Sequence, residues 1–352
     1  MRLARIIALG ALAAIAGPAL RAGDPAADRA VAALPPYRPE QTVSGTIRLW
    51  GHGSFQRPFL RQLVTGWERG FRRYHPDARI EYDMYVTSSA IAALYTGVGD
   101  LAVLGEELDP GDAALYRQFT GHELQSVPVA TGSVAVRNAD YAQMFFVHRD
   151  NPLHRVTLAQ LDGIFGAEHR RGGRNLRTWG DLGLTGAWAA RPIHPYGWAI
   201  DDSFGIYLER ALLGGSHRWN GDLREFRHIA RPDGSIYDHG RQILDALARD
   251  PDGIAVSNIG YAGPGVKPLA LAERAGGPYV AVSAATLIAE TYPLTRLIPA
   301  CFPRTPGSPL DPRVKEFLRY ILSREGQADI VRDGSYLPLR PDIAAAAIRN
   351  LE

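Results

Sequence analysis

The sequence has one cysteine among its 352 residues, Cys301, and almost no excess of either charge. A single cysteine excludes an internal disulfide framework and any cysteine-rich zinc or iron–sulfur centre. Lysine and arginine number 39 and aspartate and glutamate 37, so the net charge is +2. That balance argues against binding nucleic acid through bulk charge. Beyond the first 22 residues, no run is long and apolar enough for the ~20 residues of a membrane span.

Familiar enzyme motifs are also missing. The chain contains no G-x-S-x-G, H-E-x-x-H, G-x-x-x-x-G-K-[ST] or G-x-G-x-x-G pattern. None of its ten histidines forms a helix-spaced metal pair, and His122-Glu123 lacks the second histidine of a zinc motif. We therefore expect no catalytic residue, no metal and no cofactor. A hydrolase that uses Ser54 with His52 is disfavoured, because no orienting carboxylate is evident beside them.

The composition that is present belongs to an ordinary globular protein. Hydrophobic residues make up 46% of the chain and charged residues 22%, which is enough apolar material for a sizeable core. At about 150 residues per domain, the length predicts about two domains. The 37 glycines and 25 prolines indicate many turns between short elements.

The first residues resemble a targeting segment rather than part of the fold. A basic start is followed by an apolar run over residues 6–15 and small residues up to Ala22, the pattern of a secretory signal peptide over 1–22. Its removal would lower the net charge from +2 to −1, because it contains three arginines and no acid. Residues 23–41, rich in alanine and proline, are expected to be a flexible leader. The mature chain is therefore expected to be exported to the periplasm.

From Thr46 onward, short strands alternate with amphipathic helices. Residues 46–50, 79–85 and 101–104 read as strands, and 88–95 as a helix. Between the first two strands, apolar residues recur at helical spacing: Leu60, Leu63, Val64, Trp67 and Phe71. This order predicts an α/β sheet with crossover helices.

A second block of the same kind follows. Strands are expected at 144–148, 193–196 and 254–257, and helices at 207–213 and 242–248. Thr157 with Gln160 forms a capping box, and Asp311-Pro312 marks another helix start.

Small polar residues follow three of the expected strands where a helix should begin. The clusters are Gly51-His52-Gly53-Ser54, Thr87-Ser88-Ser89 and Asp201-Asp202-Ser203-Phe204-Gly205. Free backbone N–H groups at a helix start, surrounded by hydroxyls and glycines, bind anions. Each cluster alone is also explained as an ordinary helix cap. Three of them at the carboxyl ends of strands indicate a ligand site, because open α/β sheets bind ligands there.

At this point the sequence resembles the solute-binding proteins of phosphate ABC transporters, which have the type II periplasmic binding protein fold. The resemblance spans about Thr46 to Arg340. Its motifs, in order, are Gly97-Val98-Gly99-Asp100-Leu101-Ala102, Asn151-Pro152-Leu153, Thr157-Leu158-Ala159-Gln160-Leu161-Asp162-Gly163-Ile164-Phe165, Trp179-Gly180-Asp181-Leu182, Ile259-Gly260-Tyr261-Ala262, Tyr292-Pro293-Leu294-Thr295-Arg296, Ile321-Leu322-Ser323-Arg324-Glu325-Gly326-Gln327 and Tyr336-Leu337-Pro338-Leu339.

The resemblance implies a two-lobed α/β protein, each lobe a mixed sheet flanked by helices. The chain would cross between lobes and return, so that lobe I comprises 42–130 and 283–345 and lobe II comprises 131–282. The ligand, phosphate or a related oxyanion, would lie in the cleft between the lobes. The partner would be an ABC permease of the inner membrane, no nucleic acid would be bound, and the protein would be a monomer.

The resemblance also implies the ligand residues. Ser54 matches the first hydroxyl position of the family, Ser88 or Ser89 the second, and Ser203 the serine of its Ser-Gly-Thr turn. The neighbouring Asp202 and Gly205 would complete that helix start. Asp100 stands where the family places the aspartate that accepts a hydrogen bond from the proton of the phosphate.

Some positions depart from the family pattern. The turn reads Ser203-Phe204-Gly205, the arginine before it is not evident, and Gly105-Glu106-Glu107 follows the Asp100 motif. Losing a bidentate cation and adding carboxylates weakens the binding of a dianion if these groups face the cleft. Trp198 and Phe204 beside the third cluster therefore favour an alternative. In that alternative, the same fold binds a different organic solute or a protein partner.

Overall fold

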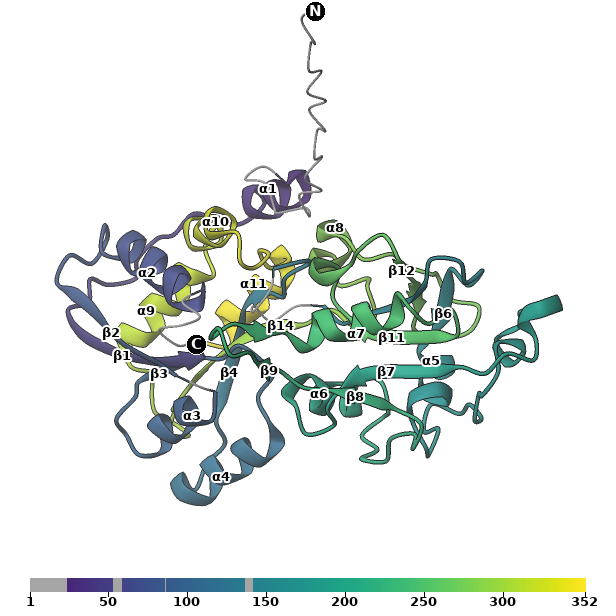
Figure 1. Ribbon diagram of the computed structural model, residues 1–352. Coiled ribbons are helices and arrows are strands. Elements are labelled where there is room, and N and C mark those ends of the chain that lie inside the picture. Colours follow the sequence, from purple (N-terminus) through teal and green to yellow (C-terminus); the bar gives the residue numbers. More distant parts are fainter. Residues whose placement is uncertain (1–23, 53–58, 86, 137–141) are drawn as a thin grey trace, which may run out of the picture.

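A computed structural model of the chain describes residues 24–52, 59–85, 87–136 and 142–352. Two sheets stand side by side in Figure 1, each with helices on both sides. The first has the strand order β2-β1-β3-β14-β4 and the second β12-β5-β11-β7-β8. The predicted two-lobed mixed α/β architecture is confirmed. Within the described residues, no helix is long and apolar enough to cross a membrane.

The first sheet combines strands from both halves of the chain. Its members are β1 (Gly45–His52), β2 (Ala78–Tyr85), β3 (Leu101–Val103), β4 (Gln125–Thr131) and β14 (Leu297–Phe302). Strand β1 runs parallel to β2 and β3, whereas β14 runs antiparallel to β3 and β4. The parallel arrangement places the carboxyl ends of β1, β2 and β3 at one edge of the sheet.

Helices cover both faces of this first sheet. One face packs on α2 (Phe59–Phe71), α9 (Pro312–Ile321), α10 (Arg324–Asp333) and α11 (Pro341–Arg349). The other face packs on α3 (Thr87–Tyr95) and α4 (Pro110–Thr120). The apolar stripe predicted for α2, from Leu60 to Phe71, is at most 1% exposed, so that prediction is confirmed. Asp311 caps α9 ahead of its first-turn proline, as expected.

The second sheet is built from the middle of the chain. Its strands are β5 (Met144–His148), β7 (His194–Trp198), β8 (Arg224–Phe226), β11 (Gly253–Ser257) and β12 (Val266–Pro268). Its core also contains α5 (Leu158–Phe165), α6 (Ser203–Ala211), α7 (His239–Leu247) and α8 (Ala284–Ile288). The predicted capping box of Thr157 and Gln160 starts α5. Two short pairs, β6 (Arg155–Thr157) with β13 (Ala270–Ala272) and β9 (Ile229–Ala230) with β10 (Ile236–Tyr237), lie outside this sheet.

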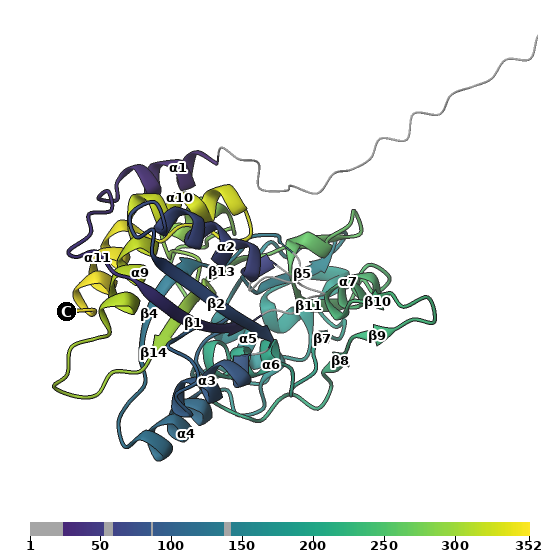
Figure 2. The same cartoon turned by 90° about the vertical axis from the view of Figure 1, so that its left-hand side faces the viewer.

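The segment expected to be a flexible leader, residues 23–41, is instead folded from Asp24 onward. Helix α1 (Pro25–Ala32) is capped by Asp24 and packs between α10 and α8 (Figures 1 and 2). Farther on, the buried hydroxyl of Tyr37 donates a hydrogen bond of 2.6 Å to Glu316. Burial and this hydrogen bond raise the pKa of Tyr37 well above its ordinary value. Composition suggested flexibility, but buried apolar and hydrogen-bonded groups hold this segment to the fold.

The predicted lobe boundary at 282/283 also differs from the packing. Helix α8, Tyr292 and Leu294 pack into the core of the second sheet, although the sequence placed residues 283–345 in lobe I. Strand β14 is the first element after α8 that joins the first sheet. Packing therefore places the return of the chain to the first lobe at about Thr295.

Candidate functional site

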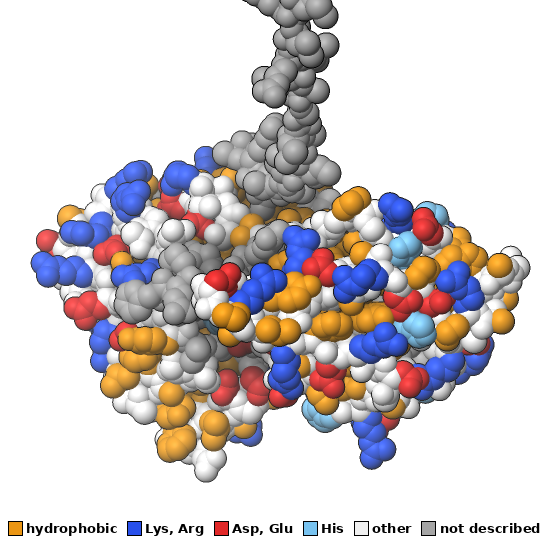
Figure 3. All heavy atoms as spheres, viewed as in Figure 1, with side chains coloured by type: hydrophobic (Ala, Val, Ile, Leu, Met, Phe, Trp, Pro, Cys, Tyr) orange, Lys and Arg blue, Asp and Glu red, His pale blue; other side chains and the backbone are white. Residues whose placement is uncertain are grey.

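A cavity of about 280 Å³ lies where the first lobe meets the second. The first lobe contributes residues from α3, from the loop after β3 and from α4. The second lobe contributes Asp201 before α6 and residues along the length of α6. The lining residues are Thr87, Glu106, Glu107, Asp109, Asp112, Asp201, Ser203, Ile206, Tyr207 and Arg210. In the space-filling view, acidic side chains gather at the lower edge where the two lobes meet (Figure 3). Helix starts from both lobes thus open onto one cavity.

In the first lobe, the ends of the three parallel strands converge beside this cavity. Thr87 is the first residue of α3 and is 6% exposed. Its hydroxyl lies 3.3 Å from Nδ1 of His52, which ends β1. A Cβ atom on Gly105 would lie 2.6 Å from the His52 ring, so only glycine at 105 lets this ring pack there. The first two predicted polar clusters therefore meet through His52 and Thr87.

In the second lobe, the third predicted cluster forms the start of α6. Asp202 is its N-cap, with Oδ1 accepting a hydrogen bond of 3.1 Å from the backbone N–H of Phe204. Ser203 is the first helical residue, and it lines the cavity. Gly205 is buried and does not line the cavity. Its role is close packing, because a Cβ atom there would lie 2.5 Å from the carbonyl oxygen of Ala199.

Replacing Gly205 by alanine is expected to lower the free energy of unfolding by about 1–3 kcal/mol, because the added methyl group overpacks against backbone. The matched control is Gly66→Ala within α2, where a Cβ atom meets nothing within 4 Å. That control should be neutral or stabilising by about 0.5–1 kcal/mol. Urea unfolding followed by tryptophan fluorescence measures both. Equal effects of the two substitutions would refute this role for Gly205.

Carboxylates dominate the cavity lining. Five of the ten lining residues are acidic and one, Arg210, is basic. Burial, together with repulsion from Asp109 and Glu106, raises the pKa of Asp112 above its usual value. Arg210 reaches across from α6 and pairs with Asp109 at 2.5 Å, so one ion pair joins the two lobes at the cavity. Such a site favours a ligand that can donate hydrogen bonds to carboxylates.

A buried arginine holds one of these carboxylates in place. The Arg296 side chain, 1% exposed, binds both carboxylate oxygens of Glu107. Its guanidinium also lies 4.2 Å from the centre of the Tyr207 ring on α6. Arg296 immediately precedes β14, where the chain returns to the first lobe. One cation therefore ties the returning strand, the loop after β3 and α6 together.

Asp100 does not lie at this cavity. It precedes β3, at the amino end of the parallel strands, whereas the cavity lies at their carboxyl ends. Its carboxylate accepts hydrogen bonds from the side chain and the backbone N–H of Arg48. Burial works against its ionised form, but the bonds from Arg48 outweigh it and lower the pKa of Asp100. The predicted role of Asp100 as the acceptor of the ligand proton does not fit this position. The carboxylates of Glu106 and Glu107, shortly after β3, line the cavity instead.

The structure does not place the other predicted hydroxyl residues of the first lobe at the cavity. Ser54 lies outside the described residues. Ser88 and Ser89 follow Thr87 in the first turn of α3, Ser88 is exposed, and neither lines the cavity. The neighbouring Thr87 lines the cavity instead, and α3 begins with it, one residue earlier than expected.

The aromatic residues that favoured an organic ligand lie in the core of the second lobe. Trp198 is 1% exposed, its ring centre is 5.1 Å from that of Phe204, and neither lines the cavity. Phe204 is one residue from Ser203, but helical geometry turns the two side chains to different sides. The observation behind the alternative ligand therefore does not apply to this cavity.

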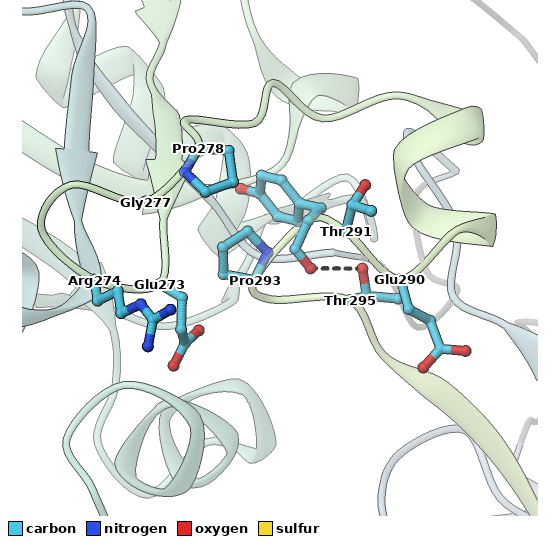
Figure 4. Close-up of a pocket in the computed structure, with 9 residues that line it drawn as sticks. Glu273, Arg274, Gly277, Pro278, Glu290, Thr291, Pro293 and Thr295 are labelled. Carbon is cyan, nitrogen blue, oxygen red and sulfur yellow. Dashed lines mark hydrogen bonds between the residues drawn. The ribbon is translucent and has the colours of Figure 1, made fainter.

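A larger cavity of about 500 Å³ lies elsewhere, between the loops 273–278 and 290–295 (Figure 4). Its wall includes Glu273, Arg274 and Glu290, and Thr295 donates a hydrogen bond of 2.8 Å to the carbonyl oxygen of Tyr292 beside it. None of the predicted ligand residues lines it. Size alone therefore does not identify the ligand site.

Known proteins are similar in sequence to nearly the whole chain. A family model described as a PBP superfamily domain matches residues 37–325. The phosphate-binding protein PstS of two Pseudomonas aeruginosa strains is 32% identical over 321 residues, 91% of each chain.

Solved structures agree on the fold. PstS from Borrelia burgdorferi gives a TM-score of 0.56 at 13% identity, covering 84% of this chain and 99% of its own. An ABC-type phosphate transport receptor from Vibrio cholerae gives 0.51 at 17% identity, covering 83% and 100%. The chain therefore belongs to the PBP superfamily, in the family of the phosphate-binding protein PstS.

Proposed function

We propose that this protein is an exported receptor that captures phosphate in the cavity between its lobes and delivers it to an ABC permease. The single observation that carries the proposal is the meeting of two helix starts, Thr87 of α3 and Ser203 of α6, at one cavity. Helix N-termini offer free N–H groups and a partial positive charge to an oxyanion. Relatives named for phosphate binding support the same ligand.

Glu106 and Glu107 face the cavity, so the weakening expected from added carboxylates applies to an anion without a proton. It is offset for an oxyanion that donates its proton in a hydrogen bond to one of them. A carboxylate accepts a hydrogen bond from the O–H of hydrogen phosphate, but it repels sulfate, which has no proton to donate at neutral pH. Glu106 lines the cavity beside Glu107, whose charge Arg296 compensates. We assign the role of proton acceptor to Glu106, because Arg296 already binds both oxygens of Glu107.

The protein acts in the periplasm and works by binding and release. The signal-peptide pattern of residues 1–22 lies outside the described residues and supports export to the periplasm. Delivery requires only binding and release through a hinge motion of the two lobes, so no catalytic step is proposed. We propose a monomer as the active form.

Isothermal titration calorimetry of the mature, phosphate-free chain tests the ligand. We expect one phosphate per chain and an affinity for sulfate at least about 100-fold weaker, because sulfate leaves the acceptor carboxylate unpaired. Equal affinities for phosphate and sulfate, or no heat with phosphate, would overturn the assignment. Fractionation of cells that express the full chain tests export, with the protein expected in the periplasmic fraction.

A further inference from the structure

A short hairpin in the second lobe brings two histidines and an aspartate together. Strands β9 and β10 pair antiparallel, with Ile236 opposite Ala230 and Tyr237 opposite Ile229. Continued by one position, this register places Asp238 opposite His228, and His239 follows as the first residue of α7. The histidines are eleven positions apart in sequence, which is not the three- or four-residue spacing of a metal-binding pair on a helix. The sequence pattern therefore did not predict the cluster.

The turn of the hairpin fixes this register. Its sequence is Pro232-Asp233-Gly234, and Gly234 has a φ of 78°, which favours glycine. The carboxylate of Asp233 accepts a hydrogen bond of 2.9 Å from the backbone N–H of Ser235. The loop is therefore a defined turn, and it holds His228 beside the start of α7.

The polar side chains of this cluster lie close together. The rings of His228 and His239 stack with centres 3.9 Å apart. One donor atom from each of His228, Asp238 and His239 lies within 4.8 Å of the other two. Oδ2 of Asp238 is 3.7 Å from Nδ1 of His228, and Oδ2 of Asp202 is 3.6 Å from Nδ1 of His239. Two carboxylates therefore flank two imidazoles.

One histidine of the cluster is accessible and the other is buried. Nδ1 of His228 accepts a hydrogen bond of 3.3 Å from the backbone N–H of His239. This bond occupies the lone pair of that nitrogen, so a metal at Nδ1 would have to displace it. The His228 side chain is 33% exposed and gives access from solvent. The His239 side chain, 5% exposed, is fixed by packing against Trp198. The His228 side chain can therefore move, whereas the His239 side chain is held in place.

We propose that His228, Asp238 and His239 form a binding site for a divalent transition metal of the Zn²⁺ class. Two imidazoles and a carboxylate are typical zinc ligands, and the fourth position is left to water or Asp202. Tetrahedral ligands at about 2.0–2.2 Å from the metal lie about 3.3–3.6 Å apart. The cluster must therefore contract by about 1 Å, which rotation of the exposed His228 side chain can supply.

This site is separate from the cavity between the lobes. None of its three residues lines that cavity. Asp202 lies between the two sites. It caps α6, whose residues line the cavity, and its carboxylate also faces His239. The proposal rests on the hairpin geometry and does not depend on the ligand of the cavity.

Zn²⁺ calorimetry and the visible spectrum of bound Co²⁺ test the site. The protein is the mature chain without an affinity tag, treated with a chelator and kept in phosphate-free buffer. We expect one ion per chain, with the Co²⁺ absorption of a four-coordinate site. His228→Ala and Asp238→Asn should each weaken binding at least about tenfold. The asparagine variant keeps a capping side chain for α7, so its fold should be retained.

The control variant is His154→Ala, which removes an exposed histidine elsewhere and should bind Zn²⁺ as the unchanged chain does. Thermal unfolding without metal verifies that each variant is folded. Absence of one-to-one binding by the unchanged chain would overturn the proposal. So would variants at 228 and 238 that bind as tightly as the His154→Ala control.

Discussion

Replacing Arg296 by methionine is expected to lower the free energy of unfolding by about 3 kcal/mol and to weaken phosphate binding. Arg296 is the buried partner of Glu107, and removing one member of a buried ion pair leaves an uncompensated charge that costs about 3–5 kcal/mol. The lower value applies because the Glu107 side chain is 33% exposed. The free carboxylate would also repel an anion in the cavity. Urea unfolding and phosphate calorimetry measure the two effects.

A second substitution separates the causes. In the double variant Arg296→Met with Glu107→Gln, no charge is left alone, so most of the lost stability and affinity should return. If the double variant is no more stable than Arg296→Met alone, the ion pair does not account for the loss. If Arg296→Met leaves phosphate affinity unchanged, the charge of Glu107 does not act on the ligand.

Replacing Ser203 by aspartate is expected to reduce phosphate affinity at least about 100-fold without unfolding the protein. Ser203 is the first residue of α6 and lines the cavity. A negative side chain is favourable at a helix start, so the fold should be retained. Two unit charges about 4 Å apart repel by about 4 kcal/mol at an effective dielectric constant near 20. Calorimetry with phosphate and thermal unfolding of the same sample measure both outcomes.

The matched control is Ser88→Asp, which adds the same charge to the first turn of α3 but away from the cavity. Its phosphate affinity should stay within a few-fold of that of the unchanged chain. Equal losses in the two variants would show that general charge, rather than the cavity, governs binding. No loss in Ser203→Asp would remove α6 from the site.

Local patterns predicted strands and helices that carry a clear apolar periodicity or a clear cap, but not most of the short strands or the helices without these signals. Periodic apolar residues located α2, and polar caps located the starts of α5 and α9, because these signals act within a few residues. The expected helix at 207–213 begins earlier, at Ser203. The reason is that Asp202 caps it and Gly205 packs on backbone, whereas the apolar pattern becomes regular only later. The prediction of a flexible leader over residues 23–41, made from composition, was wrong, because helix α1 in this segment packs against α10 and α8.

The cavity could not be predicted from the sequence, because residues that are far apart in the chain form it and a single sequence does not specify their contacts. The family resemblance located the start of α6 correctly but assigned the acceptor carboxylate to Asp100, which binds Arg48 of β1 away from the cavity. Pairing between Arg296 and Glu107 spans 189 positions. No local spacing signals such a pair. The order of strands had to be known before these residues could be placed together.

A crystal structure of the protein grown with phosphate tests the central claim most directly. We predict one tetrahedral anion between the lobes, within hydrogen-bond distance of the hydroxyls of Thr87 and Ser203 and of the carboxylate of Glu106. Phosphate held by one lobe alone, or bound in the larger cavity between loops 273–278 and 290–295, would contradict the account.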